Sequence, residues 1–212
     1  MNRFYDIVCF CISITARLLF RLEVIGVNNV PASGPVILAS NHASNLDPPL
    51  IAARLSRQCH VLAKEELFSV PLLGWLIRHL NARPIRRGVV DRAALRQCAD
   101  VLNQGNILII FPEGTRTRDG RLQEAKPGAA MIAAITGAPI VPVYLDGTFG
   151  AMPRGRGFPR PRKVKIYIGK PFIPPSGARS GTGSKRELYE LLAAEMMARI
   201  EELKPADAPP RA

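Results

Sequence analysis

Short apolar segments alternate with segments of helical periodicity from Leu22 almost to the carboxyl terminus. The apolar segments, which predict strands, cover residues 23–27, 36–40, 60–63, 83–85, 107–111, 140–144 and 164–168. The segments of helical pattern cover residues 48–57, 71–80, 91–104 and 127–136. Residues 107–111 are apolar throughout, which is typical of a strand buried on both faces. The alternation predicts an α/β fold in which a mixed, largely parallel sheet is flanked by helices.

The first 22 residues form an apolar segment with charges on both sides. Ten uncharged residues, from Ile7 to Ala16, stand between Asp6 and Arg17. Ten helical residues rise ~15 Å, half the ~30 Å hydrocarbon core of a bilayer. We therefore predict a helix over 3–22 that lies in a membrane interface, with Arg17 and Arg21 near headgroups. Its apolar residues include Phe4, Ile7, Val8, Cys11, Leu18 and Phe20. The alternative is a helix packed on the protein's own core.

The carboxyl-terminal region predicts one more helix. Ser184 and Glu187 form a Ser-x-x-Glu capping box, and an apolar stripe follows it. The stripe consists of Leu188, Leu192, Met196, Ile200 and Leu203, and its simplest interpretation is core packing. Residues 174–184, rich in Gly, Ser and Pro, predict a flexible loop, and residues 205–212 predict a disordered tail.

Composition narrows the class of protein. The 212 residues are 47% hydrophobic, which excludes a disordered chain, and no apolar run is long enough for a polytopic membrane protein. The 29 Lys and Arg exceed the 17 Asp and Glu, which gives a net charge of +12. This charge indicates an anionic partner. Aromatic residues make up only 6%, which speaks against binding of single-stranded nucleic acid. The four cysteines contain no Cys-x-x-Cys pair, so we expect no metal module and a reducing compartment.

One strand end carries a candidate base. The apolar segment 36–40 leads into a polar turn that contains His42 and, five residues later, Asp47. Ligands of open α/β sheets bind at the carboxyl ends of strands. A turn of this length lets Asp47 hydrogen-bond one ring nitrogen of His42 and leave the other nitrogen free as a base. The alternative is that Asp47, directly before Pro48, only caps the next helix.

A second strand end carries candidate phosphate ligands. The segment 107–111 ends in a turn that contains Glu113, Gly114 and Arg116. Gly114 lets the backbone approach a ligand closely, and the forked guanidinium of Arg116 suits a phosphate. Lys126 stands at the start of a helix, whose free N–H groups favour an anion. The alternative for each cation is a solvated surface charge.

These segments resemble four sequence blocks of the glycerophospholipid acyltransferase family, most closely its 1-acyl-sn-glycerol-3-phosphate acyltransferase branch. Asn41, His42 and Asp47 match the His-x4-Asp block, and residues 111–116 read Phe-Pro-Glu-Gly-Thr-Arg. The second block is matched by residues 64–68, Pro71, Gly74-Trp75 and Ile85-Arg86-Arg87, and the fourth by residues 139–143. Asn81-Ala82 stands where the family has Gly, and Arg86 where an acidic residue often precedes the block's arginine, so Arg86 and Arg87 both remain candidates.

The resemblance implies the family's fold over residues 23–204 as an acyltransferase domain. It also implies transfer of a fatty acyl group from a thioester, on coenzyme A or acyl carrier protein, to the sn-2 hydroxyl of lysophosphatidic acid. His42 would remove the hydroxyl proton and Asp47 would stabilise the imidazolium. Lys64, Arg87, Arg116 and Lys126 would hold the phosphate, while Glu113, Gly114 and Thr115 would orient the glycerol hydroxyls and line the oxyanion site. The thioester is a co-substrate, and no cofactor or metal is expected.

Further expectations concern location and rivals. Six cations lie close together at Arg154, Arg156, Arg160, Arg162, Lys163 and Lys165. They either face anionic lipid, coenzyme A phosphates or acyl carrier protein, or belong to a solvated loop. We expect a peripheral, monotopic enzyme on the cytoplasmic face of a membrane. The rivals are another acceptor (glycerol 3-phosphate or an ornithine-type lyso-lipid), a metal-dependent hydrolase with His42 and Asp47 as ligands, and a non-enzymatic basic protein.

Overall fold

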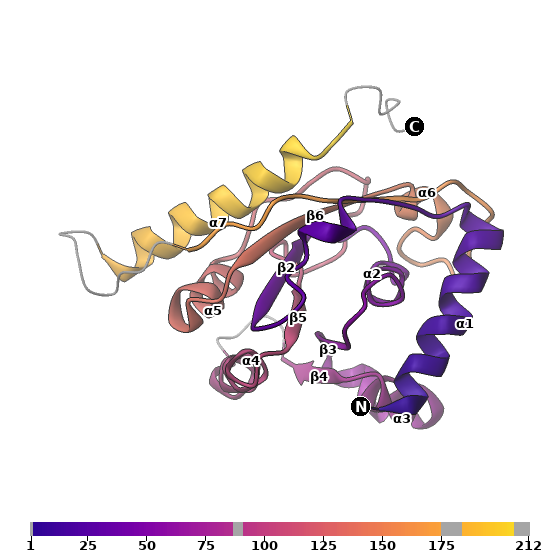
Figure 1. The fold of residues 1–212 in the computed structure, drawn as a ribbon, viewed down its shortest axis with the longest axis horizontal. Helices are drawn as coiled ribbons and strands as arrows, with labels where there is room; N and C mark the ends of the chain where they lie inside the picture. Colours follow the sequence, from indigo (N-terminus) through magenta and orange to yellow (C-terminus); the bar gives the residue numbers. More distant parts are fainter. Residues whose placement is uncertain (1, 87–90, 175–183, 206–212) are drawn as a thin grey trace.

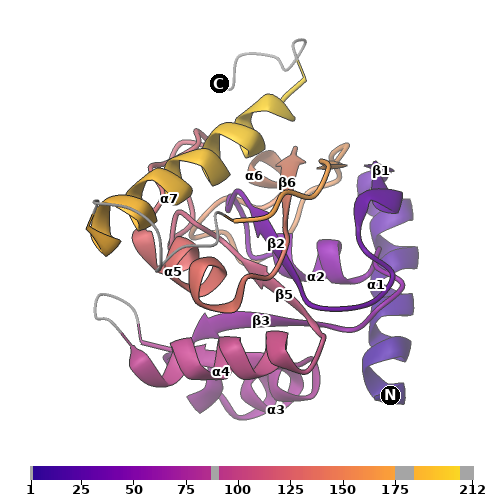
Figure 2. The same cartoon turned by 60° about the vertical axis from the view of Figure 1, so that its left-hand side comes forward.

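The computed structural model of the chain describes residues 2–86, 91–174 and 184–205. Within them, one seven-stranded sheet has the order β1-β7-β6-β2-β5-β3-β4 (Figures 1 and 2). The strands are β1 (Glu23–Ile25), β2 (Val36–Ser40), β3 (Cys59–Lys64), β4 (Ala82–Ile85), β5 (Ile107–Ile110), β6 (Ile140–Asp146) and β7 (Lys165–Ile168). The helices are α1 (Arg3–Phe20), α2 (Asp47–Ala52), α3 (Pro71–His79), α4 (Arg92–Asn103), α5 (Pro127–Thr136), α6 (Thr148–Ala151) and α7 (Lys185–Glu202). Two short 3₁₀ helices, η1 (Val27–Asn29) and η2 (Glu65–Ser69), complete the described elements.

Strand direction confirms the expected mixed, largely parallel sheet. Strand β2 is parallel to both of its neighbours, β5 and β6, and β5 continues parallel to β3 and then β4. The antiparallel pair is β6 with β7. The carboxyl ends of β2 to β6 therefore meet at one edge of the sheet, where both polar turns predicted from the sequence begin.

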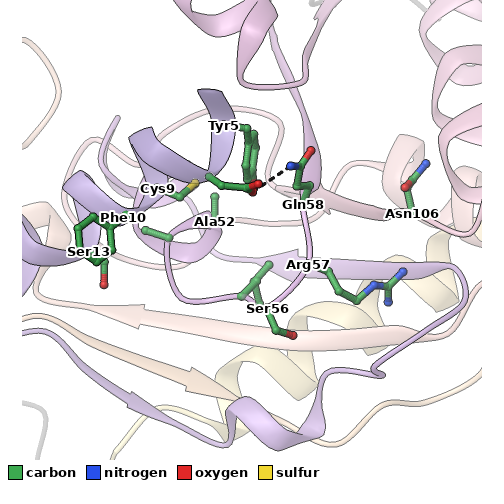
Figure 3. Close-up of a pocket in the computed structure, with 12 residues that line it drawn as sticks. Tyr5, Cys9, Phe10, Ser13, Ala52, Ser56, Arg57, Gln58 and Asn106 are labelled. Atoms are coloured by element: carbon green, nitrogen blue, oxygen red, sulfur yellow. Dashed lines mark hydrogen bonds between the residues drawn. The ribbon is translucent and has the colours of Figure 1, made fainter. Parts of the chain in front are cut away.

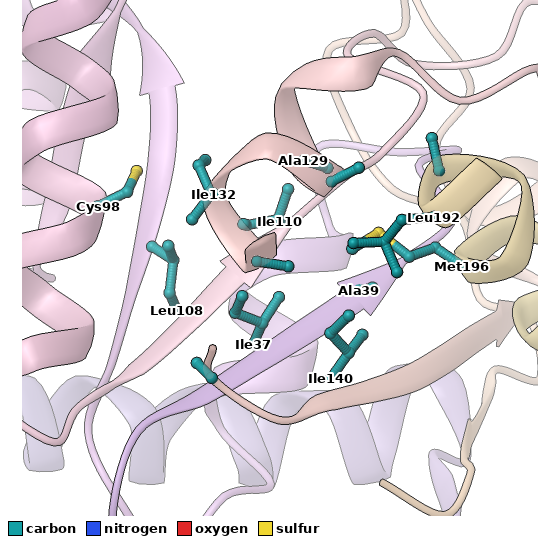
Figure 4. Packing of buried hydrophobic residues seen from close by; sticks show 14 of the residues in the cluster. Ile37, Ala39, Cys98, Leu108, Ile110, Ala129, Ile132, Ile140, Leu192 and Met196 are labelled. Atoms are coloured by element: carbon teal, nitrogen blue, oxygen red, sulfur yellow. The ribbon is translucent and has the colours of Figure 1, made fainter. Parts of the chain in front are cut away.

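Helices α4, α5 and α7 cover one face of the sheet (Figure 1). Side chains alternate along β2, so that Ile37 and Ala39 point to this face, where Leu108 of β5 and Ile140 of β6 join them (Figure 4). The predicted stripe of α7 packs here: Leu192, Met196 and Ile200 are almost completely buried. The capping box is also present, since Ser184 Oγ accepts from the Glu187 N–H at 3.2 Å and Glu187 Oε2 accepts from the Ser184 N–H at 2.9 Å.

Helix α1 packs with α2 on the opposite face. Its residues Tyr5, Ala16 and Phe20 join the core there, with Val36 and Leu38 of β2. Phe20, which we expected in a membrane interface, is only 3% exposed, because α1 needs an apolar side for the sheet as well. The exposed side of α1 carries Ile7, Phe10, Ile14 and Leu18. Among the described helices, none is both long and apolar enough to cross a bilayer.

Two predicted segments differ from the structure or lie outside the residues that it describes. The predicted helix 48–57 is shorter in the structure, where α2 ends at Ala52. Arg57, beyond the helix, donates to the carbonyl oxygens of Pro31 (2.9 Å) and Gly34 (2.7 Å). The predicted flexible loop, apart from its ends, lies outside the described residues, as do Arg87 and the tail beyond Pro205.

Candidate active site

His42 and Asp47 meet at the carboxyl end of β2. The distance from His42 Nδ1 to Asp47 Oδ2 is 2.8 Å, and both residues are buried, with 7% and 0% of their surface exposed. The same Oδ2 atom accepts the backbone N–H groups of Ala43 and Ser44, each at 2.7 Å. Asp47 is the first residue of α2, and its carboxylate faces back into the turn that precedes the helix.

These contacts set the tautomer of the ring. Three groups converge on Asp47 Oδ2, and a carboxylate oxygen in that position accepts from all of them. His42 Nδ1 therefore carries a hydrogen, so in the neutral ring the lone pair is on Nε2. With this tautomer the imidazole can take one proton at Nε2, next to a buried carboxylate that stabilises the resulting cation.

The turn after β5 contacts the backbone N–H, the carbonyl oxygen and the ring of His42. Glu113 Oε1 accepts from the backbone N–H of His42 at 2.9 Å. The backbone N–H of Thr117 donates to the His42 carbonyl oxygen at 2.9 Å. The ring of Phe111 stacks on the imidazole, with centroids 4.0 Å apart and planes inclined by 21°. The two polar turns predicted from the sequence are thus one structure, in which the second turn holds the backbone and the ring of His42.

Asn41 ties the same turn to β6. Its amide donates to the Leu145 carbonyl oxygen at 3.1 Å and accepts the Leu145 N–H at 2.7 Å. Ser44 Oγ adds a bond of 2.7 Å to the carbonyl oxygen of Met152, just beyond α6. The residue before His42 and the residue two after it are therefore both anchored to segments more than a hundred positions away.

Glu113 is buried, with 2% of its surface exposed, and both carboxylate oxygens accept hydrogen bonds from the protein. Burial raises the pKa of its carboxyl group to about 7, and the charge of Asp47 adds to the rise. Hydrogen bonds from His42 and Gln123 act in the opposite direction on this pKa. Glu113 thus binds the His42 backbone and Gln123, and the role in orienting the glycerol hydroxyls that we expected for it stays a prediction.

The candidate phosphate ligands follow the same edge of the sheet. The exposed Lys126 lies against Gly114, where an added Cβ would be 2.9 Å from Lys126 Cδ, and its N–H donates to the Pro112 carbonyl oxygen at 2.8 Å. Gly114 has a φ of 69°, which also favours glycine. Thr115 and Arg116 are half-buried in this turn.

The second-block cations lie beyond β5. Lys64, at the end of β3, pairs with Glu66 at 2.8 Å, and Arg86 pairs with Glu65 at 2.8 Å. Arg87, the other candidate for the block's arginine, is outside the described residues. A metal-dependent hydrolase requires a third ligand beside His42 and Asp47, and within the described residues no three such side chains gather to hold a metal ion.

A pocket of about 630 Å³ lies at the other edge of the sheet, between α1 and the α2–β3 connection (Figure 3). Gln58 spans it and donates to Asp6 Oδ1 at 2.9 Å and to the Asn2 carbonyl oxygen at 3.0 Å. Arg57, also on its wall, is bound to backbone carbonyl oxygens. The pocket is built at the amino ends of the strands, away from His42.

The fold and the site define an acyltransferase. The sequence model of the acyltransferase family matches residues 21–146, which include His42, Asp47 and the whole turn after β5. The chain belongs to this family.

Several of its relatives carry the name of one branch of the family. A chloroplast 1-acyl-sn-glycerol-3-phosphate acyltransferase of Brassica napus is 35% identical over 76% of this chain and 47% of its own length. A protein of the same name from Bacillus subtilis is 30% identical over 71% of this chain and 73% of its own. The crystal structure of the 1-acyl-sn-glycerophosphate acyltransferase of Thermotoga maritima matches with a TM-score of 0.73 and 33% identity, over 94% of this chain and 80% of that one. The chain spans about half the length of the Brassica relative.

Proposed function

We propose that the protein is an O-acyltransferase that moves a fatty acyl group from coenzyme A or acyl carrier protein to the sn-2 hydroxyl of lysophosphatidic acid, forming phosphatidic acid. One observation carries the proposal: the buried pair of His42 and Asp47 at the carboxyl edge of the sheet. The names of the relatives support the choice of acceptor.

The pair suits the chemistry of this transfer. The acceptor oxygen attacks the thioester carbonyl carbon while His42 Nε2 takes the hydroxyl proton, and Asp47 stabilises the imidazolium. The tetrahedral intermediate then releases the thiolate, which receives the proton from His42. Base catalysis contributes ~10²–10⁴ in rate, so positioning of the two substrates supplies much of the rest. The acceptor is itself the nucleophile, so the reaction needs no acyl-enzyme and no cofactor beyond the thioester co-substrate.

Cations of the same edge bind the acceptor phosphate in this proposal. Arg116 lies in the turn that holds His42, and Lys126, at the start of α5, lies against Gly114 of the same turn, which supports a shared phosphate site. Lys64 and Arg87 follow β3 and β4 and extend the basic edge. A guanidinium offers the phosphate a forked pair of donors, and an ammonium offers a compact charge.

The exposed side of α1 rests on a membrane leaflet in this proposal. Ile7, Phe10, Ile14 and Leu18 share that side, and Leu18 is 78% exposed. Helix α3 lies beside α1 (Figures 1 and 2) and adds Trp75, whose ring is 5.3 Å from that of Phe4. Apolar side chains with flanking arginines are typical of interfacial helices, and a lysophosphatidic acid acceptor resides in such an interface. We place the enzyme on the cytoplasmic leaflet as a peripheral protein.

The basic segment 152–165, which follows α6, contacts the turn that contains His42 at one end and helix α1 at the other. Met152, which begins it, accepts from Ser44 in the His42 turn, and Val164, near its end, donates to the Phe20 carbonyl oxygen in α1. Arg154, Arg156, Arg160 and Arg162 are exposed along it. This position suits contacts with anionic headgroups or with the thioester donor.

The proposal is tested by thiol release from acyl-coenzyme A and from acyl carrier protein with a panel of acceptors. Lysophosphatidic acid is expected to support turnover, and monoacylglycerol, which lacks the phosphate, is expected to support far less. Glycerol 3-phosphate and an ornithine-type lyso-lipid test the rival acceptors. Release that is equal with and without any acceptor would overturn the proposal, because it would indicate a thioesterase.

A further inference from the structure

Gln123 lies between β5 and α5, outside the motifs that carry the chemistry, and it contacts the turn that holds His42. Its Nε2 atom donates to Glu113 Oε2 at 2.8 Å and to the Thr115 carbonyl oxygen at 3.3 Å. The peptide oxygen only accepts hydrogen bonds, so the amide must present its NH₂ group to this side. One side chain thus joins two points of the turn, ten and eight positions earlier in the chain.

We propose that Gln123 is a positioning residue for His42 and acts through Glu113. The proposal rests on the proposed function, in which His42 is the base. The contacts form a continuous path. The Gln123 amide donates to one oxygen of Glu113, and the other oxygen of Glu113 accepts from the backbone N–H of His42. The hydrogen bonds of the Gln123 amide run to Glu113 and to the Thr115 carbonyl oxygen, so any effect on the imidazole passes through the turn.

The path depends on Glu113 being ionised. A buried carboxylate needs donors for both oxygens, and a protonated carboxyl group is a weaker acceptor for the His42 N–H. Asp47 faces Glu113 as a like charge that favours protonation, whereas Lys126 and Arg116, on the same turn, are cations. The hydrogen bond from Gln123 also favours the ionised form. Loss of Gln123 therefore disfavours the carboxylate and loosens its hold on His42.

The direction of the pH effect follows. Burial gives Glu113 a pKa of about 7, so the carboxylate that holds His42 is complete above that pH and is lost as the pH falls. Without the Gln123 donor this pKa rises further. The acidic limb of kcat should therefore move to higher pH, while KM for lysophosphatidic acid stays close to its native value.

The central variant is Gln123→Leu, which keeps most of the volume and the backbone hydrogen bond to Glu113 and removes the side-chain donor. Its matched control is Gln58→Leu, since Gln58 also donates from a half-buried amide to a carboxylate, Asp6, but at the amino ends of the strands. Gln123→Glu keeps the size of the side chain and sets a second carboxylate against Glu113, so it keeps the test available if leucine prevents folding.

Two measurements decide the proposal. In Gln123→Leu, kcat at pH 7 should fall about fivefold and recover toward the native value near pH 9. Carboxyl-carbon NMR should show Glu113 titrating about one pH unit higher, and Gln123→Glu should raise it further. Gln58→Leu should leave both the titration and the acidic limb unchanged. An unchanged Glu113 titration, or an equal loss of kcat at every pH in the two leucine variants, would overturn the proposal. If the native protein transfers no acyl group, the proposed function fails, and the NMR titration still tests the path from Gln123 to Glu113.

Discussion

At the scale of single residues, Asp47 performs two tasks, and neither is the helix cap that the sequence offered as the alternative, because Leu46 is the N-cap of α2 and no side chain caps that helix. Its Oδ2 atom closes the turn through the N–H groups of Ala43 and Ser44, and it also binds the ring of His42. The first task needs only an acceptor oxygen, whereas stabilising an imidazolium needs a charge. The two tasks can therefore be separated by one substitution.

Asp47→Asn should fold and yet lose acyl transfer. The amide oxygen can still accept from the turn and from the ring, but the negative charge is gone. We expect kcat to fall by at least ~10², comparable to the loss of a general base, with little change in thermal unfolding. Steady-state kinetics together with circular dichroism check this. Activity near the native level would show that Asp47 is only a structural residue.

Arg116→Lys tests the phosphate site at the same scale. The substitution keeps the charge but removes the forked geometry, so KM for lysophosphatidic acid should rise about tenfold. Turnover of a monoacylglycerol, which has no phosphate, should not change. Equal effects on the two acceptors would place Arg116 outside the phosphate site.

Predictability at this scale depends on sequence separation. The contact of His42 with Asp47 spans five positions, so residue types and turn length were enough to predict it. The partners of Asn41 and Thr117 lie 104 and 75 positions away, on strands whose neighbours the sequence pattern does not specify. A single glutamine in an irregular segment has no pattern at all, which is why Gln123 could not be found from the sequence.

At the scale of elements, α1 serves two surfaces. The sequence offered an interfacial helix or a core helix, and the structure shows one side of α1 in the core and another side apolar and exposed. Removal of the whole helix would therefore also take Tyr5, Ala16 and Phe20 out of the core that they share with β2. Point substitutions on the exposed side test the membrane proposal more cleanly.

Phe10→Asp should weaken binding to anionic vesicles. Phe10 is 66% exposed, so the change removes an apolar side chain from the proposed contact without opening the core. Burial of such a side chain contributes about 2 kcal/mol, so the vesicle partition coefficient should fall more than tenfold. Thr15→Asp, at an exposed position of the same helix, adds an equal charge and should have a much smaller effect in sedimentation assays. Equal losses in both variants would reject the apolar contact.

Asn41→Ala tests the tie between β2 and β6. The buried peptide group of Leu145 would lose both of its hydrogen bonds to the side chain, at a cost of about 2–3 kcal/mol in the free energy of unfolding. Asn29→Ala, which removes one bond to the Ile168 carbonyl oxygen from a half-buried position, should cost about 1 kcal/mol. Urea denaturation compares the two. A smaller cost for Asn41 would mean that the turn is held by its other contacts.

At the scale of the whole molecule, the sheet brings one end of each central strand to a single edge. The α/β class, the strand positions and the edge that carries the chemistry were predictable from apolar periodicity and polar strand ends. The order of the strands was not, because several orders satisfy the same alternation of helices and strands. Only the order with β2 between β5 and β6 lets Glu113 and Leu145 reach the two sides of the His42 turn.

The net charge of +12 acts over this larger scale. Each basic residue near an anionic leaflet contributes ~1 kcal/mol, and salt screens that contribution, whereas apolar burial is not screened. In the proposed function, this charge would gather the protein, an anionic acceptor and the thioester donor at one surface, but it would not perform the transfer.

The most direct test of this account is the yield of phosphatidic acid from lysophosphatidic acid and acyl-coenzyme A, measured with native protein and with His42→Ala. The native protein should form phosphatidic acid and free thiol in equal amounts. His42→Ala should remain folded and form both at least ~10² times more slowly. Native rates in His42→Ala would contradict the account, since they would show that the buried pair at the edge of the sheet is not the base.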